Sequence, residues 1–183
     1  MTTAGTSSSE GTSAPTVDAV AMRQAMGRFA TGVAVVTTRH DGVPHGMTVN
    51  SLTSVSLDPP LLLVCLTTGA RTTDAVVDAG RFVVNILAAR QEQLALRFAR
   101  RGEEHFAGLD ADQVDNGHDL PVVPGALVHA DCTVDRVVTA GDHIVVLGRV
   151  DAVCRNDATP LAFHGGRFAD LRPHGAEHDL WFA

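Results

Sequence analysis

The sequence contains no lysine and no tyrosine among its 183 residues, and each absence removes a class of chemistry. Without lysine, the protein cannot form a Schiff base through a side-chain amine, and it has no lysine for a phosphate-binding loop. Without tyrosine, it has no phenolic acid or base. Every basic residue other than histidine is therefore an arginine.

Cysteine is scarce, and its spacing excludes the usual thiol sites. Cys65, Cys132 and Cys154 are far apart and form no Cys-x-x-Cys pair, so the sequence indicates neither a zinc ribbon nor a redox dithiol. Each lies in an apolar, strand-like run, where we expect buried and unreactive thiols. This use of cysteine is typical of a reducing compartment and predicts a cytoplasmic protein.

Long apolar runs and excess positive charge are also missing. No segment reaches the roughly 18 consecutive apolar residues that a membrane span requires. The formal net charge of −7 disfavours general affinity for nucleic acid or for anionic membranes. Residues 1–16 are rich in Ser, Thr, Gly and Ala, which predicts a disordered N-terminal tail and not a signal peptide.

What remains predicts one mainly β domain over residues 17–172, with a C-terminal tail at 173–183. Helices are expected at 17–30, with Thr16 as N-cap, at 73–79 and at 91–101, flanking the strands. Residues 103–124 are polar and rich in Asp and Gly, which predicts a long loop. Strands are expected at 33–38, 44–50, 53–57, 61–66, 82–87, 126–138, 143–154 and 161–163.

This spacing of turns favours a barrel over a parallel sheet with crossover helices. No Gly-x-Gly-x-x-Gly motif is present, so the sequence does not support a Rossmann dinucleotide site. His174 and His178 sit four residues apart, but they lie in a tail that contains Pro and Gly. We expect exposed histidines there and no metal site.

Two patches carry candidate chemistry. Residues 46–61 crowd hydroxyl and amide side chains between apolar strands, which fits either a plain strand connection or a concave site for a flat, polar-edged ring. Asp142-His143 stands at the start of a strand, where a structural histidine is the simpler interpretation. Farther on, Arg167 and Phe168 follow two glycines, and an arginine beside an aromatic ring suits a phosphate and a flat ring.

Taken in order, these segments resemble the flavin reductase-like, FMN-binding split-barrel family over residues 22–171. The motifs that carry the resemblance are Phe29-Ala30-Thr31-Gly32-Val33, Gly46-x-Thr48-x-Asn50-Ser51, Pro59-Pro60-Leu61, Phe82-Val83-Val84-Asn85, Gly141-Asp142-His143 and Gly165-Gly166-Arg167-Phe168.

The resemblance implies a homodimeric split β-barrel with flavin in a groove near the subunit interface. It places Thr48, Val49, Asn50 and Ser51 at the edge of the flavin ring. It implies that the ribityl chain and phosphate are held by Ser54, Cys65, Leu66, Thr67, Arg71 and Thr72. Phe98 and Arg100 would complete the pocket. It places the nicotinamide beside His143, Arg167 and Phe168. Members of the family often carry tyrosine at the position of Phe168.

The implied function is an NAD(P)H:flavin oxidoreductase that passes hydride from NADH or NADPH to FMN or FAD. The reduced flavin would then serve a separate flavin-dependent monooxygenase, with His143 positioning the nicotinamide. Two alternatives are a non-catalytic flavin-binding or sensor protein and a flavoenzyme with tightly bound FMN acting on its own substrate. A pyridoxamine-phosphate-oxidase-like enzyme fits poorly, because such enzymes use basic and phenolic side chains that this chain lacks.

Overall fold

The computed structural model describes residues 17–102, 105–109, 120–172 and 175. The predicted N-terminal tail at 1–16 lies outside these residues, and so does the C-terminal tail except for Gly175. His174 and His178 also lie outside them.

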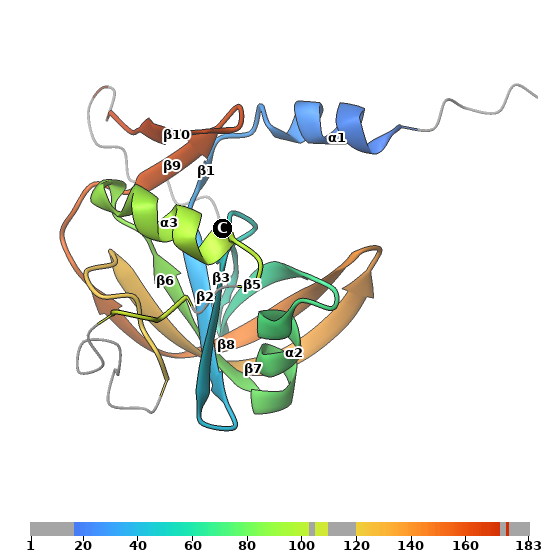
Figure 1. Cartoon of the computed structure of the whole chain (residues 1–183), viewed down its shortest axis with the longest axis vertical. Coiled ribbons are helices and arrows are strands. Elements are labelled where there is room, and N and C mark those ends of the chain that lie inside the picture. The colour runs from blue at the N-terminus through green and yellow to red at the C-terminus, as the bar shows by residue number, and fades with distance from the viewer. Residues whose placement is uncertain (1–16, 103–104, 110–119, 173–174, 176–183) are drawn as a thin grey trace, which may run out of the picture.

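The body of the protein is a seven-stranded antiparallel sheet in the order β3-β2-β6-β7-β8-β5-β4 (Figure 1). Its two longest strands, β7 and β8, pair as one hairpin. The bounds are β2 (Ala34–His40), β3 (Val43–Val49), β4 (Thr53–Leu57), β5 (Pro60–Thr67), β6 (Arg81–Ile86), β7 (Val128–Ala140) and β8 (His143–Arg155).

A second, smaller sheet has the order β1-β9-β10 and lies near the top of Figure 1. Its strands are β1 (Thr31–Gly32), β9 (Leu161–His164) and β10 (Arg167–Asp170). The helices are α1 (Ala19–Met26), α2 (Arg71–Ala79), the short 3₁₀ helix η1 (Ala89–Gln91) and α3 (Glu92–Ala99). The expected mainly β fold with flanking helices is confirmed.

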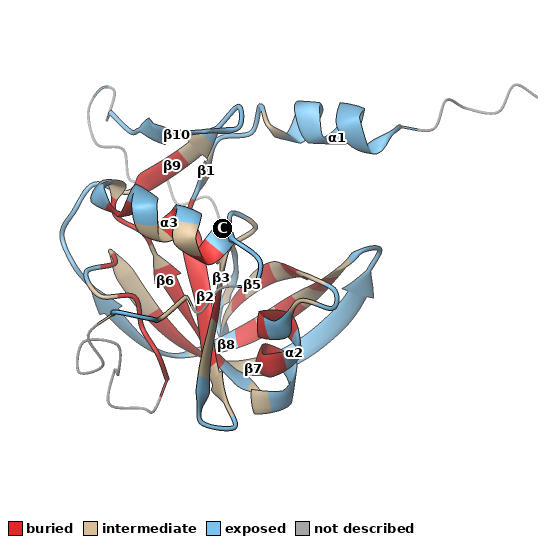
Figure 2. Ribbon diagram, in the orientation of Figure 1, coloured by how far each residue is buried: buried red, intermediate tan, exposed pale blue. Residues whose placement is uncertain are grey.

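Strand β2 lies at the centre of the core because both of its faces are covered. Val36 belongs to a cluster with Val64 and Val146, whereas Val35 belongs to a second cluster with Phe98 of α3. Figure 2 shows the buried residues concentrated in these central strands. Full burial of one such side chain contributes about 1.5–3 kcal/mol, so these clusters fix α3 against the sheet.

A buried asparagine joins the segment before β7 to the sheet. The Asn85 side-chain nitrogen donates to the carbonyl of Val35 at 2.9 Å, and its oxygen accepts from the N–H of Val123 at 2.8 Å. Leu120 and Val122 are buried against Val83. The prediction of a loop that is polar as far as residue 124 is therefore wrong at its C-terminal end.

The first helix differs most from the prediction. Asp18, and not Thr16, is the N-cap, because its Oδ1 accepts from the N–H of Ala21 at 2.7 Å. The helix ends at Met26, four residues earlier than expected, and none of its residues is buried. In Figure 1, α1 projects away from both sheets. Periodicity identified the helix, but no face of it is covered within the described chain.

The prediction that the cysteine thiols are buried is confirmed for one of the three. Cys132 is buried, and desolvation, followed by the nearby Asp151 and Asp131 carboxylates, raises its pKa to about 12. Cys65 is half-buried and Cys154 is exposed. Cys154 is exposed because the C-terminal end of β8 extends beyond the core, and residues 151–155 are all exposed there.

The close approach of β8 to the Phe82 ring predicts a specific sensitivity. A Cβ on Gly148 would lie 2.5 Å from the ring, so Gly148→Ala forces buried side chains to shift. We expect a loss of about 1–3 kcal/mol in the free energy of unfolding, measured by urea denaturation. Gly32→Ala is the matched control, because open space surrounds that position, and it should change stability by less than about 0.5 kcal/mol. Equal losses in the two variants would contradict this packing.

Candidate active site

A cleft of about 820 Å³ opens between β3, the N-terminus of α2 and the end of α3. Four segments line it, at residues 43–48, 67–72, 98–102 and 105–107. They come from parts of the chain that are far apart in sequence and meet only in the fold.

The carbonyl of Gly46 on β3 joins these segments. It accepts a hydrogen bond from Thr72 Oγ1 at 3.1 Å and lies 2.9 Å from His105 Nδ1. The Phe98 ring packs so closely that a Cβ at position 46 would lie 2.7 Å from it. A residue without a side chain is therefore required where α2, α3 and the following segment approach the strand.

The N-terminus of α2 faces this cleft and suits an anion. Its N-cap, Ala70, supplies no side-chain hydrogen bond to the first turn, and the positive end of the helix dipole lies here. Arg71 is exposed at the first helical position and lines the cleft, beside the Thr72 hydroxyl. Backbone N–H groups and a guanidinium together provide hydrogen-bond donors for a phosphate.

His45 stands on the same side of the cleft as this helix end. Its pKa is lowered from the ordinary value of 6.5, chiefly by partial burial and then by the positive charges of Arg71 and His40. The neutral ring is therefore favoured, which leaves one N–H donor and one acceptor nitrogen at the cleft wall.

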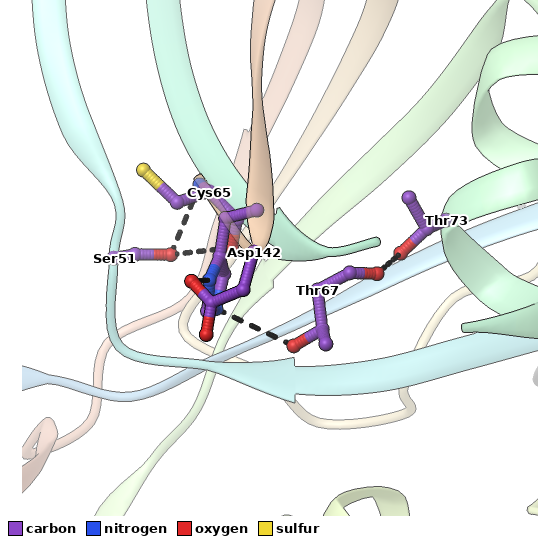
Figure 3. Close-up of polar contacts among 6 residues, drawn as sticks. Ser51, Cys65, Thr67, Thr73 and Asp142 are labelled. Atoms are coloured by element: carbon purple, nitrogen blue, oxygen red, sulfur yellow. Dashed lines mark hydrogen bonds and ion pairs between the residues drawn. The ribbon is translucent and has the colours of Figure 1, made fainter. Parts of the chain in front are cut away.

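A second polar group gathers along β5 next to the cleft (Figure 3). Ser51 Oγ donates to the carbonyl of Cys65 at 2.9 Å and accepts from its N–H at 3.0 Å. Two residues farther along, Thr67 pairs with His143 of β8, and their side chains lie 3.4 Å apart between Oγ1 and Nε2. The structure thus brings the hydroxyl-rich segment and the Asp-His turn to one end of β5.

The Asp142 carboxylate orients His143. His143 Nδ1 lies 2.8 Å from Asp142 Oδ1, and this hydrogen bond is the main reason that the pKa of Asp142 is lowered. With the Nδ1 hydrogen donated to the carboxylate, Nε2 faces the Thr67 hydroxyl. The His143 side chain remains 41% exposed and can therefore reach a bound ligand.

Six predicted flavin contacts line the cleft, namely Thr48, Thr67, Arg71, Thr72, Phe98 and Arg100. Thr48 donates its hydroxyl hydrogen to the carbonyl of Ala95 at 2.7 Å, so it also ties β3 to α3. Phe98 is 1% exposed and contributes a floor to the cleft.

The other predicted contacts lie outside the cleft lining. Ser51 and Cys65 bond to each other beside it, as described above. Leu66 is fully buried and Val49 nearly so, and both are paired within the sheet, so their side chains do not face the cleft. Asn50 and Ser54 are exposed before and within β4. Arg167 and Phe168 belong to the second sheet, where the Phe168 ring packs edge-on against Phe163 at 5.6 Å.

Sequence reasoning missed two histidines of the cleft. His45 and Met47 are two residues apart on β3 and therefore share one face of the strand. This period-two pattern could have revealed His45. His105 had no such signal, because its contact with Gly46 joins residues 59 positions apart. Arg101 also lines the cleft.

An antiparallel, mainly β fold whose cleft combines an aromatic floor, hydroxyl groups and a helix end suited to an anion agrees with the predicted flavin-binding split barrel. The chain belongs to the flavin reductase like domain family, whose sequence model matches residues 26–172. The predicted family and fold class are thereby confirmed.

Individual relatives agree with this assignment. An NADH-dependent flavin reductase from Rhodococcus sp is 40% identical, with 92% of this chain and 95% of that protein covered. The flavin-dependent monooxygenase reductase subunit HsaB from Mycobacterium tuberculosis is 36% identical, with 90% and 89% covered. The solved structure of the NADH:FAD oxidoreductase SgcE6 from Streptomyces globisporus, in complex with NAD and FAD fragments, is 36% identical. Its TM-score is 0.80, with 89% of this chain and 100% of that chain covered.

The predicted enzyme class, an NAD(P)H-dependent flavin reductase, is confirmed by these relatives. No helix in the described part of the chain has the length and apolar character to cross a membrane.

The electrostatics of the cleft can be tested through His45. Arg71→Gln removes a nearby positive charge, so we expect the pKa of His45 to rise toward 6.5, as measured by NMR titration. His40→Gln, which removes the weaker of the two charges, should raise it less. The lowered pKa also means that protonation of His45 favours unfolding, so its contribution destabilises the fold as pH falls below 6.5. An unchanged titration in Arg71→Gln would place the guanidinium away from His45.

Proposed function

We propose that this chain reduces FMN or FAD with NADH or NADPH in the cleft beside β5, and releases the reduced flavin to a separate monooxygenase. The observation that carries the proposal is the adjacency of two sites. The helix end at Arg71 suits a phosphate, and one strand away His143 is held by Asp142 and Thr67.

The residues present fit a flavin. A flat tricyclic ring needs an apolar floor, which Met47 and Phe98 supply, and a polar edge, which hydroxyls and backbone groups supply. A ribityl phosphate needs donors, which the N-terminus of α2 and Arg71 offer. The volume of 820 Å³ also lies within the roughly 300–1,000 Å³ that small-molecule sites occupy.

When bound, flavin supplies the hydride acceptor and reduced nicotinamide supplies the hydride. The task of the chain is to hold two flat rings in contact, which provides proximity and orientation. No side chain must transfer a proton for this step. His143 therefore acts as a positioning residue for the nicotinamide, with Asp142 fixing the orientation of its ring.

We further propose that the enzyme works as a homodimer in the cytoplasm. Large apolar side chains remain exposed on the single chain, including Val20 and Met22 of α1 and Leu57 of β4, which is 78% exposed. Exposed apolar side chains on this scale support a covering second copy. Its three free cysteines agree with a reducing compartment.

The direct test is consumption of NADH or NADPH by the purified protein with added FMN, FAD or riboflavin, followed at the absorbance band of the reduced nicotinamide. We expect turnover that depends on added flavin and a protein that loses yellow colour during purification. No turnover with any pair would favour a flavin-binding or sensor protein. Colour retained through purification would favour a flavoenzyme that acts on its own substrate.

The role of His143 predicts a selective kinetic effect. His143→Ala removes the ring beside Thr67, so we expect the KM for NADH to rise roughly tenfold while the Kd for flavin stays within about twofold. Asp142→Asn should produce a smaller rise, because the ring remains but its Nδ1 partner is weakened. His40→Ala, at the half-buried end of β2 and without contact to His143, is the matched control. Stopped-flow kinetics in which His143→Ala behaves like this control would remove His143 from the site.

A further inference from the structure

His105 bridges two walls of the cleft. Its Nδ1 lies 2.9 Å from the carbonyl of Gly46 on β3, and its Nε2 lies 2.9 Å from the carbonyl of Arg100 at the end of α3. Its ring centroid is 5.2 Å from that of Phe98, and the side chain is half-buried in the cleft lining. The ring is thus held on both edges and one face.

Both polar partners of this ring are carbonyl oxygens, which only accept hydrogen bonds. A protonated imidazole donates to both, and either neutral tautomer donates to one. The backbone at Arg100 is extended, with φ −76° and ψ 148°, so the chain leaves α3 here. The His105 bond to the Arg100 carbonyl therefore fixes the start of the turn at residues 100–102, which carries Arg101 into the cleft lining.

The opposite wall depends on the same acceptor. Thr72 Oγ1, from the first turn of α2, donates to the carbonyl of Gly46 at 3.1 Å. One carbonyl on the floor thus fixes both the anion-suited end of α2 and, through His105, the turn that carries Arg101. The contacts of Thr72 and His105 with the Gly46 carbonyl therefore set the separation between the N-terminus of α2 and the turn at residues 100–102.

We propose that His105 is a positioning residue for the flavin phosphate. It holds the turn at residues 100–102 facing the N-terminus of α2, so that Arg71 and Arg101 meet the same anion from opposite walls. The inference rests on the proposed function and adds to it a residue that acts through others. The proposed role concerns the flavin phosphate and not the flavin ring, because Gly46 and Phe98 form the floor of the cleft without a contribution from His105.

The experiment compares three substitutions in steady-state assays with FMN and with riboflavin, which lacks the phosphate. His105→Leu removes both bonds and should raise the KM for FMN about tenfold, with kcat and the KM for riboflavin unchanged. His105→Asn places its amide nitrogen near the position of Nδ1 and should restore most of the FMN affinity. His105→Gln places its amide nitrogen near Nε2 and should restore part of it.

His164→Leu, the same change at an exposed histidine outside the cleft lining, is the control and should leave both KM values unaltered. An equal rise for FMN and riboflavin would indicate a general loss of packing and overturn the proposal. So would an unchanged KM for FMN in His105→Leu. If that variant fails to fold, His105→Gln decides, because its KM for FMN must rise while that for riboflavin does not. Failure of the wild-type protein to reduce any flavin would instead refute the proposed function.

Discussion

The constraint on which the site depends is the absence of a side chain at Gly46. The Phe98 ring occupies the space where a Cβ would stand. The carbonyl of the same residue accepts a hydrogen bond from Thr72 and faces His105. A larger residue would push α3 away from β3 and move both walls of the cleft. Packing and polar geometry are therefore not separable here, because the same backbone unit carries both.

Strand β5 provides the second fixed element. The backbone of Cys65 bonds to Ser51, and two residues farther along the strand the Thr67 side chain meets His143. Ser51 bonds to the backbone of Cys65 on both its N–H and its carbonyl, which leaves little freedom in the chain between β3 and β4. The two proposed cofactor sites can therefore lie next to each other without any flexible connection between them.

How far the sequence predicted this structure depended on whether the signal was local. Apolar runs located the strands, β4 with identical bounds, and Gly80 ended α2 with its left-handed φ of 65° as expected. What failed was non-local. The amphipathic pattern of α1 could not reveal that no described element covers it, and the polar stretch before β7 concealed the pairing of Val123 with Asn85. His105 was invisible for the same reason, since only the fold brings it to Gly46.

The absence of lysine and tyrosine is compatible with the proposed chemistry. Hydride transfer between two bound cofactors demands close and oriented rings, whereas the reactivity belongs to the cofactors themselves. A site for such a reaction can be built from backbone carbonyls, hydroxyls, arginines and histidines that position the cofactors and each other. The described cleft contains these groups, and Asp142 orients His143 without itself being buried. Because positions matter more than acidity in such a site, we expect substitution of packing residues such as Gly46 and Phe98 to impair it as strongly as substitution of the groups that touch the ligand.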